Sequence, residues 1–257
     1  MRPAAFPEED GLAKIDAVPG RTYSAEELCG RIVERHRERI KVRKPALVVA
    51  NLSRIVTAFL KLSNRKGFHA TSLRELAEAS GLSMGGLYTY FDSKETLLLM
   101  VLDEVADTMR ELLSAVPADI AAHPRAHLRW LIANHVRLSE AMQPWFVFAF
   151  MEAKSFPPSA RRSAIDSEML AETELARIFE RGTAAGIFAV AEPQLAAALV
   201  KPLLQDWYVK RAKYRKRNIG IDAYVDGVTG FVERATLKHD PEKWKPVFGK
   251  DHGQKDK

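Results

Sequence analysis

Side chains that can bind phosphate oxygens and base edges gather between Thr71 and Lys94, in the stretch TSLRELAEASGLSMGGLYTYFDSK. Hydroxyl and ammonium groups donate hydrogen bonds to phosphates, and small or apolar side chains contact thymine methyl groups. The adjacent glycines Gly85 and Gly86 cost a short helix roughly 1 kcal/mol each relative to alanine. Glycines are worth this cost where the backbone must approach a phosphate or a base edge closely, because they carry no side chain. This combination of residue types predicts a surface that binds double-stranded DNA.

The elements that must position these groups are two short helices joined by a tight turn. Ser72 and Glu75 have the spacing of a capping box, which predicts the start of the first helix. Gly81 ends that helix because glycine adopts the left-handed conformation of a tight turn at low cost. A second helix is expected over residues 83–90. Its exposed positions are Ser83, Met84, Gly85, Gly86, Tyr88, Thr89 and Tyr90.

The positive charge of the chain is concentrated beside this stretch. The net charge is +6, and residues 21–66 hold 12 lysines and arginines against four glutamates. Clustered positive charge on a helical segment is typical of proteins that bind the phosphate backbone of DNA. A solvated basic helix face would give the same charge pattern. The neighbouring helix-turn-helix pattern favours DNA binding over that alternative.

The helix-turn-helix stretch resembles the signature of the TetR family of transcriptional regulators. The matching segments are Thr71-Ser72, Leu76-Ala77, residues 80–83, residues 87–91 and residues 93–97. The resemblance covers residues from about 47 to 98. It is specific, because a generic helix-turn-helix does not need Leu-Tyr-x-Tyr-Phe followed by Ser-Lys-Glu. It implies a homodimeric repressor that responds to a small molecule.

The resemblance also implies which residues contact DNA. The expected set is Thr71, Ser72, Ser83, Met84, Gly85, Tyr88, Thr89, Tyr90 and Lys94. Within it, Tyr88, Tyr90 and Lys94 would contact phosphates, and the second helix would approach the base edges. Met84 stands where the family often has a polar residue, so its contact is apolar or absent. Tyr88 has an alternative role as part of the core.

Helical periodicity runs through the chain and no segment alternates as a strand does, so the expected fold class is all-α. We expect a DNA-binding domain over residues 23–96 and a ligand-binding and dimerisation domain over residues 97–238. A disordered N-terminus, residues 1–22, and a mobile tail, residues 239–257, would flank them. An extra basic helix, about Ser24–Val42, opens the DNA-binding domain. It either adds phosphate contacts or braces that domain.

The middle of the second domain is rich in aromatic residues and methionines. These side chains either form a packed core or line an apolar cavity for an effector. The set is Trp130, Met142, Trp145, Phe146, Phe148, Phe150, Met169 and Phe179. The segment from Trp207 to Tyr224 resembles family members that respond to acyl-CoA thioesters. The expected effector is therefore apolar, aromatic or of the acyl-CoA type. Candidate cations for its phosphates are Arg161, Arg162, Arg177, Lys210 and Arg211.

The last two long helices, near residues 193–216 and 221–238, stand where the family builds a dimer interface. Pro202 is expected to kink or interrupt the first of them. The apolar residues expected at the interface are Leu195, Leu199, Leu203, Trp207, Tyr224, Val228 and Phe231. Alternatively, these side chains close the core of the monomer. A two-fold dimer would require a roughly palindromic operator.

Several function classes lack their motifs. The sequence has no glycine-rich phosphate loop, nucleophile elbow or His-Glu-x-x-His pattern, so we expect neither an enzyme nor a cofactor. His123, His127 and His135 have a possible metal spacing, but no cysteine or acidic pattern supports a metal site. Cys29 is the single cysteine and is expected on an apolar helix face, as in a reducing compartment. With no signal peptide and no membrane span, a cytoplasmic protein is expected.

Overall fold

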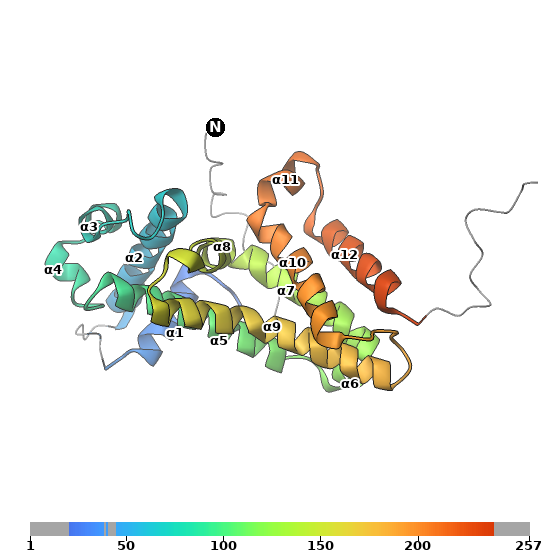
Figure 1. Cartoon of the computed structure of the whole chain (residues 1–257). Coiled ribbons are helices and arrows are strands. Elements are labelled where there is room, and N and C mark those ends of the chain that lie inside the picture. Colours follow the sequence, from blue (N-terminus) through green and yellow to red (C-terminus); the bar gives the residue numbers. More distant parts are fainter. Residues whose placement is uncertain (1–20, 39, 41–44, 239–257) are drawn as a thin grey trace, which may run out of the picture.

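A computed structural model describes residues 21–38, 40 and 45–238, and helices form almost all of this part of the chain (Figure 1). The α-helices are α1 (Ala25–Arg35), α2 (Pro45–Lys66), α3 (Leu73–Ser80), α4 (Met84–Leu87), α5 (Lys94–Ser114), α6 (Ala118–Ala122), α7 (Pro124–Ala141), α8 (Gln143–Met151), α9 (Pro158–Ala184), α10 (Pro193–Val209), α11 (Arg211–Lys216) and α12 (Ile221–Thr236). A short 3₁₀ helix, Ala153–Ser155, follows α8. The expected all-α class is confirmed.

Serine side chains fix where the helices of the N-terminal part begin. Ser24 Oγ accepts a hydrogen bond from the Glu27 backbone N–H at the start of α1, as Ser93 does from Thr96 at the start of α5. Ser72 and Glu75 form a complete capping box at the start of α3. Each cap satisfies a backbone donor that has no partner inside the helix. The helix starts predicted at Ser24 and Ser72 are therefore confirmed.

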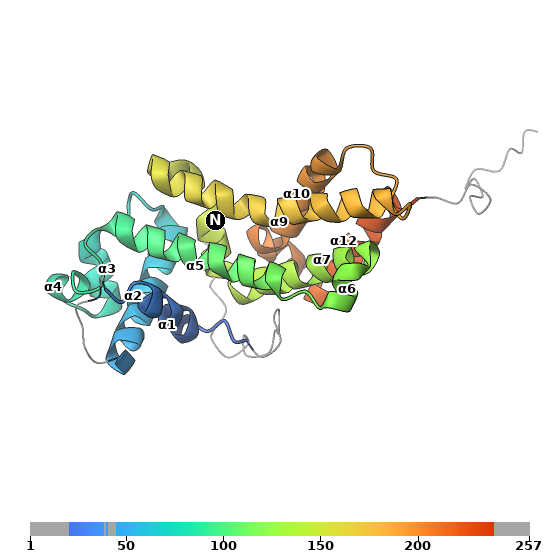
Figure 2. The ribbon, with the colours of Figure 1, turned by 90° about the horizontal axis from the view of Figure 1, so that it is seen from below.

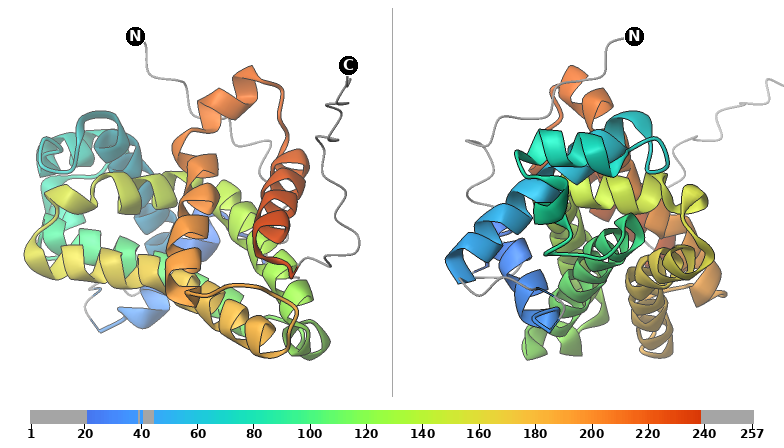
Figure 3. Two further views of the ribbon diagram at one scale, coloured as in Figure 1. Left: turned by 45° about the vertical axis from the view of Figure 1, so that its right-hand side comes forward. Right: turned by 90° about the vertical axis from the view of Figure 1, so that its left-hand side faces the viewer.

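The helices are arranged along an elongated molecule. Helices α1–α4 gather at one end, and α10–α12 cover the other half (Figure 1). Helices α5 and α9 run side by side along the length and join the two parts (Figure 2). The end view in Figure 3 shows the same pair lying beside each other. Helix α5, the first helix after the helix-turn-helix, thus connects the DNA-binding candidate to the rest of the chain.

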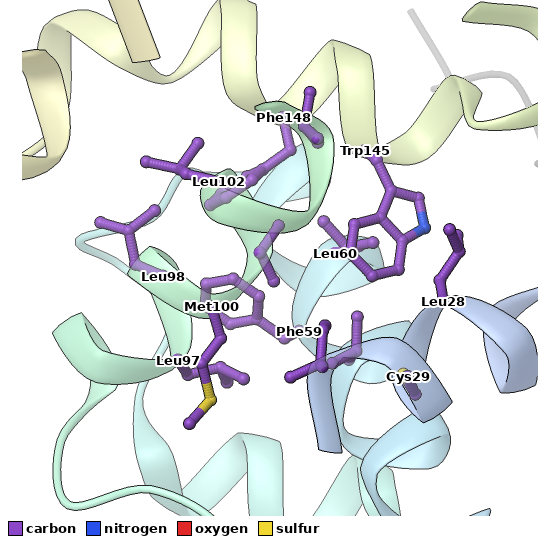
Figure 4. Close-up of a cluster of buried hydrophobic side chains, with 14 of the residues drawn as sticks. Leu28, Cys29, Phe59, Leu60, Leu97, Leu98, Met100, Leu102, Trp145 and Phe148 are labelled. Carbon is purple, nitrogen blue, oxygen red and sulfur yellow. The ribbon is translucent and has the colours of Figure 1, made fainter. Parts of the chain in front are cut away.

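Two hydrophobic clusters hold this arrangement. The first joins α1, α2, α5 and α8, and Figure 4 shows Phe59 and Phe148 within it. Cys29 belongs to this cluster and is fully buried, as expected for a small apolar residue on a helix face. The second cluster joins α7, α9, α10 and α12 around Trp207. Because the first cluster includes α8, the N-terminal helices share a core with the second half of the chain.

Several predicted boundaries differ from the structure. Helix α1 ends at Arg35, short of Val42, and residues 36–38 form a turn. The helix expected over residues 193–216 is two helices, because the chain bends at Lys210. Of the two effects expected of Pro202, an interruption is wrong, since α10 continues through this residue. The proposed disordered N-terminus, apart from its last two residues, and the proposed tail lie outside the described residues. No helix in the described ranges is long and apolar enough to cross a membrane.

Candidate DNA-binding surface and effector cavity

The helix-turn-helix is held together by small and apolar side chains between α3 and α4. Leu76, Ala77 and Leu87 are buried where the two helices meet. Gly81 has a φ of +67° and donates its N–H to the carbonyls of Ala77 and Glu78, which ends α3. A residue with a Cβ is strained in this conformation, so the turn requires glycine.

The outward face of α4 carries most of the expected base-edge contacts. Met84 and Tyr88 are 39% and 43% exposed. A Cβ added to Gly85 would meet nothing closer than 4.0 Å, so packing within the protein does not require glycine there. Ser83 is exposed, but its Oγ accepts the Gly86 N–H at 3.0 Å. Thr89 Oγ1 donates to the Gly86 carbonyl at 2.6 Å. Helix α4 thus presents an exposed surface with little side chain over its backbone.

Two expected contact residues are buried instead of exposed. Tyr90 is only 2% exposed, and its hydroxyl accepts a hydrogen bond from Asn51 Nδ2 of α2 at 3.0 Å. Thr71 is fully buried and donates to the Gly67 carbonyl at 3.0 Å. The expectation that the second helix exposes Tyr90 was therefore wrong. Ser72 remains at the surface as the cap of α3.

Lys94 is directed into the DNA-binding part of the chain. Its ammonium group donates to the carbonyls of Phe68, His69 and Thr71 at 2.9, 3.3 and 2.9 Å. It also lies 4.4 Å from the centre of the Phe68 ring. Burial lowers the pKa of the Lys94 amine. Since an ammonium group has three donors, all of them are occupied here by the loop between α2 and α3.

The arginines of α1 are directed towards α5. Arg31 Nη2 lies 2.7 Å from Glu104 Oε1, and Arg35 Nη1 lies 3.1 Å from Glu104 Oε2. Glu104 is fully buried, and burial raises the pKa of its carboxyl group although both arginines oppose this rise. Further ion pairs join Arg31 to Glu111 and Arg35 to Asp107. Of the two roles considered for this helix, the geometry favours the brace.

A cavity of about 40 Å³ lies between the helices of the second half. Its lining residues are Val105, Met109, His135, Phe146, Ala149, Phe150, Ala164, Ser167, Glu168, Ala171, Lys201 and Tyr208. Of the expected pocket residues, Phe146 and Phe150 line it. The others do not: Met142, Trp145, Phe148 and Phe179 are packed in the cores, Trp130 is half-buried and Met169 is 43% exposed.

The polar residues that line the cavity were not among the expected pocket residues: they are His135, Ser167, Glu168, Lys201 and Tyr208. Lys201 is 5% exposed, and within the described part of the chain its ammonium group makes no hydrogen bond or ion pair. Burial lowers its pKa to about 8. His135 is fully buried and neither ring nitrogen has a partner among the described residues. Burial, with the nearby Lys201 charge, holds its pKa well below the usual value. A lysine inside the apolar run AAALVKPLL was the available signal.

The residues expected at a dimer interface divide into two groups. Leu195, Leu199 and Phe231 are 53%, 68% and 58% exposed, and Leu203 is half-buried. Trp207, Tyr224 and Val228 lie in the second hydrophobic cluster, where Trp207 Nε1 donates to Glu140 at 2.8 Å. These three residues therefore help to close the core of the monomer, which was the alternative to the interface.

Helix α8 links the cavity to the DNA-binding part. Phe146, Ala149 and Phe150 of α8 line the cavity. The Pro144 carbonyl of the same helix accepts from Asn64 Nδ2 at 2.9 Å. Glu152, next to the helix end, accepts the backbone N–H of Phe68 at 2.8 Å. One rigid helix therefore touches both the cavity and the loop that Lys94 holds.

Comparison with known proteins matches both parts of this architecture. A model described as bacterial regulatory proteins of the tetR family matches residues 55–101. A model of the tetracyclin repressor-like C-terminal domain matches residues 121–210, so the two together span more than half of the chain. The chain belongs to the TetR family. The members of this family are transcriptional regulators and not enzymes.

Individual relatives agree with this assignment. The HTH-type transcriptional regulator HbdR of Aromatoleum sp. (strain CIB) is 24% identical over 171 residues, 66% of this chain and 73% of that protein. A tetR-family regulatory protein from Rhodococcus RHA1 has a TM-score of 0.65 at 21% identity, covering 74% of this chain and 98% of that chain. AibR, solved with isovaleryl coenzyme A and operator DNA, has a TM-score of 0.58 at 18% identity, covering 69% and 97%. The two structures support the shared fold.

Proposed function

We propose that this TetR-family protein is a homodimeric repressor that binds a roughly palindromic operator and leaves it when a small molecule fills the cavity. The DNA part of the proposal rests on α4, whose exposed face offers Met84, Gly85 and Tyr88 for the major groove. We propose one unit for DNA binding, residues 23–96, and one for effector binding and dimerisation, residues 97–238. Since the proposed partner is chromosomal DNA, the proposed location is the cytoplasm.

The homodimer proposal is supported by exposed apolar residues on α10 and α12. Leu195 and Leu199 are one turn apart on α10 and belong to one stripe of that helix. Phe231 is exposed on α12, which packs beside α10. Large exposed apolar groups on neighbouring helices are typical of a protein interface. In a two-fold dimer the two α4 helices would enter successive major grooves, about 34 Å apart.

The regulatory part of the proposal rests on α8. A molecule much larger than water must displace lining side chains such as Phe146 or Phe150, because the cavity is only about 40 Å³. A movement of α8 would be passed on, since Asn64 donates a hydrogen bond to Pro144 and the Phe68 N–H donates one to Glu152 at the end of α8. A shift of α8 would therefore change the position of the helix-turn-helix. To release the operator, the effector must bind the DNA-incompetent arrangement more tightly than the other.

The ion pairs of the cations that were expected to bind the phosphates of coenzyme A help to narrow the class of effector. AibR was solved with an acyl-CoA, which makes a similar ligand a candidate for this chain. Here, however, Arg177 is paired with Glu174, Lys210 with Asp206 and Arg211 with Glu140, at 3.4, 2.9 and 2.8 Å. Of these candidate cations, only Arg161 and Arg162, exposed near the start of α9, form no ion pair with the described residues. The support for an effector with phosphates is therefore smaller than that for a compact one.

Selection of DNA by the purified full chain tests the function. A pool of random duplexes is passed through rounds of binding and the retained sequences are determined. We expect an inverted repeat whose half-sites are one helical turn apart. The Tyr88→Ala variant should lose affinity for that sequence and keep its fold. A pool without enrichment, or an enriched site without an inverted repeat, would count against the proposed dimeric DNA-binding mode.

A further inference from the structure

The cavity contains a deeply buried amine that has no hydrogen-bond or ion-pair partner among the described residues. Lys201 projects from α10 into a space whose remaining walls are mainly apolar, including Val105, Met109 and Phe146. Glu168 and Glu172 of α9 lie close enough to favour the charged form of the amine, but neither forms an ion pair with it. Burying a charge without a partner is costly, so a lysine persists in such a place where a ligand completes it.

A second donor lies beside this cation. His135 of α7 lines the same cavity and is close enough to Lys201 for their charges to interact. Both nitrogens of the His135 ring are buried without a partner among the described residues. A neutral imidazole carries one N–H, which requires an acceptor when it is buried. The cavity therefore offers an ammonium group and an imidazole N–H, and no described side chain accepts a hydrogen bond from either.

We propose that the cavity binds a small apolar carboxylic acid whose carboxylate accepts hydrogen bonds from Lys201 and His135. A carboxylate has two oxygens, so one can take the ammonium N–H and the other the imidazole N–H. It also supplies the negative charge that a neutral carbonyl or an alcohol would not. Identifying this acid as the effector rests on the proposed function; its binding in the cavity does not.

The one acidic group on the wall does not favour a cationic ligand. Glu168 is half-exposed, and its Oε1 already accepts a hydrogen bond from Gln205 at 2.6 Å. Lys201 and His135 are more deeply buried. Neither ring nitrogen of His135 has a partner among the described residues, and Lys201 forms no ion pair there. Both residues can donate a hydrogen bond and Lys201 is a cation, which favours an anion over an ammonium ion.

The rest of the ligand would be apolar and short. Phe146 and Ala149 of α8 and Ala164 and Ala171 of α9 form the walls around the donors. Phe150 lines the cavity and is 36% exposed, which places it at the opening to solvent. An aromatic ring or a short alkyl chain between these residues would displace α8 side chains. Coenzyme A would have to lie outside this space, away from the two donors.

Calorimetric titration of the full chain tests the proposal with matched probes. The acids are benzoate and hexanoate, their neutral counterparts are benzamide and hexanamide, and benzylamine and hexanoyl-CoA are the competing classes. We expect at least one acid to bind about tenfold or more tightly than its amide, the difference that one charged hydrogen bond provides. In Lys201→Met the acid should bind no better than the amide. Lys216→Met, an exposed change on α11, should match the wild type.

The outcomes separate this proposal from the proposed function. Equal binding of acid and amide, no binding of either acid, or tighter binding of benzylamine or hexanoyl-CoA would overturn it. So would full affinity for the acid in both Lys201→Met and His135→Phe. The operator complex is then titrated with the acid that bound. Binding to the free protein without release of DNA would contradict the effector role and leave the carboxylate site in place. If only the DNA selection fails, the proposed repressor function is contradicted and the proposed carboxylate site is not.

Discussion

Arg31 on α1 and Glu104 on α5 form an ion pair of 2.7 Å in which the carboxylate is fully buried. Arg31 Nε also donates to Glu104 Oε1 at 2.8 Å, and Arg31 Nη2 donates to Thr108 at 3.0 Å. The extra helix of this chain is thereby fastened to the helix that connects its two parts. An arginine held in this way has few donors left for a phosphate.

Arg31→Met should destabilise the protein without changing how DNA affinity depends on salt. Removing one partner of a buried pair costs up to about 3 kcal/mol, and here the buried Glu104 carboxylate would keep only Arg35. A lost phosphate contact would instead reduce the salt slope by about one. Urea unfolding and binding at several salt concentrations measure both quantities. Arg37→Met, at an exposed position just after α1, is the control. An unchanged unfolding free energy with a smaller slope would reverse the assignment.

Gly85→Ala should lower operator affinity while leaving the protein at least as stable as the wild type. The added Cβ meets no atom closer than 4.0 Å within the protein, and alanine favours a helix by roughly 1 kcal/mol. On DNA the same methyl group would stand between the backbone and the groove. Thermal unfolding and operator binding test the two effects. Gly81→Ala provides the contrast, because φ is +67° there and stability should fall by about 1 kcal/mol. Full affinity of Gly85→Ala would show that the backbone does not approach DNA at this point.

How much of this surface could be predicted depends on the range of the interactions involved. The capping box at Ser72 and the turn at Gly81 are set by neighbouring residues, and both were found in the sequence. The different exposure of Tyr88 and Tyr90 was not found. Helix α4 is a single turn, and the contact of Tyr90 with Asn51 depends on how α2 packs against it.

The cavity was harder to predict for the same reason. Its aromatic wall was anticipated only through Phe146 and Phe150. Phe148, two residues from each on the same helix, is fully buried in the first hydrophobic cluster and does not line the cavity. The burial of Lys201 depends on α7 and α9, which are distant in sequence, and no local pattern reports it. Periodicity shows that a helix has an apolar face but not which neighbour covers that face.

Tyr88→Ala should lower operator affinity, whereas Tyr90→Ala should lower the stability of the fold. Tyr88 is 43% exposed, so its removal should change stability by no more than about 0.5 kcal/mol and should lower operator affinity about tenfold through a lost phosphate contact. Tyr90 is buried, and its truncation should cost about 3 kcal/mol of folding free energy. Chemical unfolding and gel shifts separate the two. Equal loss of stability in both variants would mean that Tyr88 belongs to the core after all.

The double variant Leu199→Glu, Phe231→Glu should be a folded monomer with weak DNA binding. Both side chains are more than half exposed in the protomer, so the charges do not disturb its core. In a dimer they would be buried without partners. Loss of the second half-site should reduce operator affinity about a hundredfold or more. Sedimentation velocity gives the oligomeric state, and Ile165→Glu on α9 serves as the exposed apolar control. If the double variant still sediments as a dimer, the interface lies elsewhere.

Lys201→Met should stabilise the ligand-free protein at neutral pH, and the gain should disappear as the pH rises. Burial lowers the pKa of Lys201 from 10.5 to about 8. Below pH 8 the amine is charged in both the folded and the unfolded chain, so the folded state carries the whole cost of burying the charge. Between pH 8 and 10.5 the folded chain releases this proton and the unfolded chain keeps it, which favours folding.

The size of the gain follows from that shift. About 2.5 pKa units correspond to roughly 3 kcal/mol, which Lys201→Met should recover at pH 7 and progressively lose above pH 8. The groups that face the amine are Glu168 and Glu172 from α9, His135 from α7 and Tyr208 on α10 itself. Burial raises the pKa of Tyr208, which keeps the phenol neutral in this range. Urea unfolding at pH 7 and pH 10 tests the sign. A variant less stable than the wild type at pH 7 would mean that Lys201 has a stabilising partner inside the protein, and the cavity would then have no unsatisfied charge to offer a ligand.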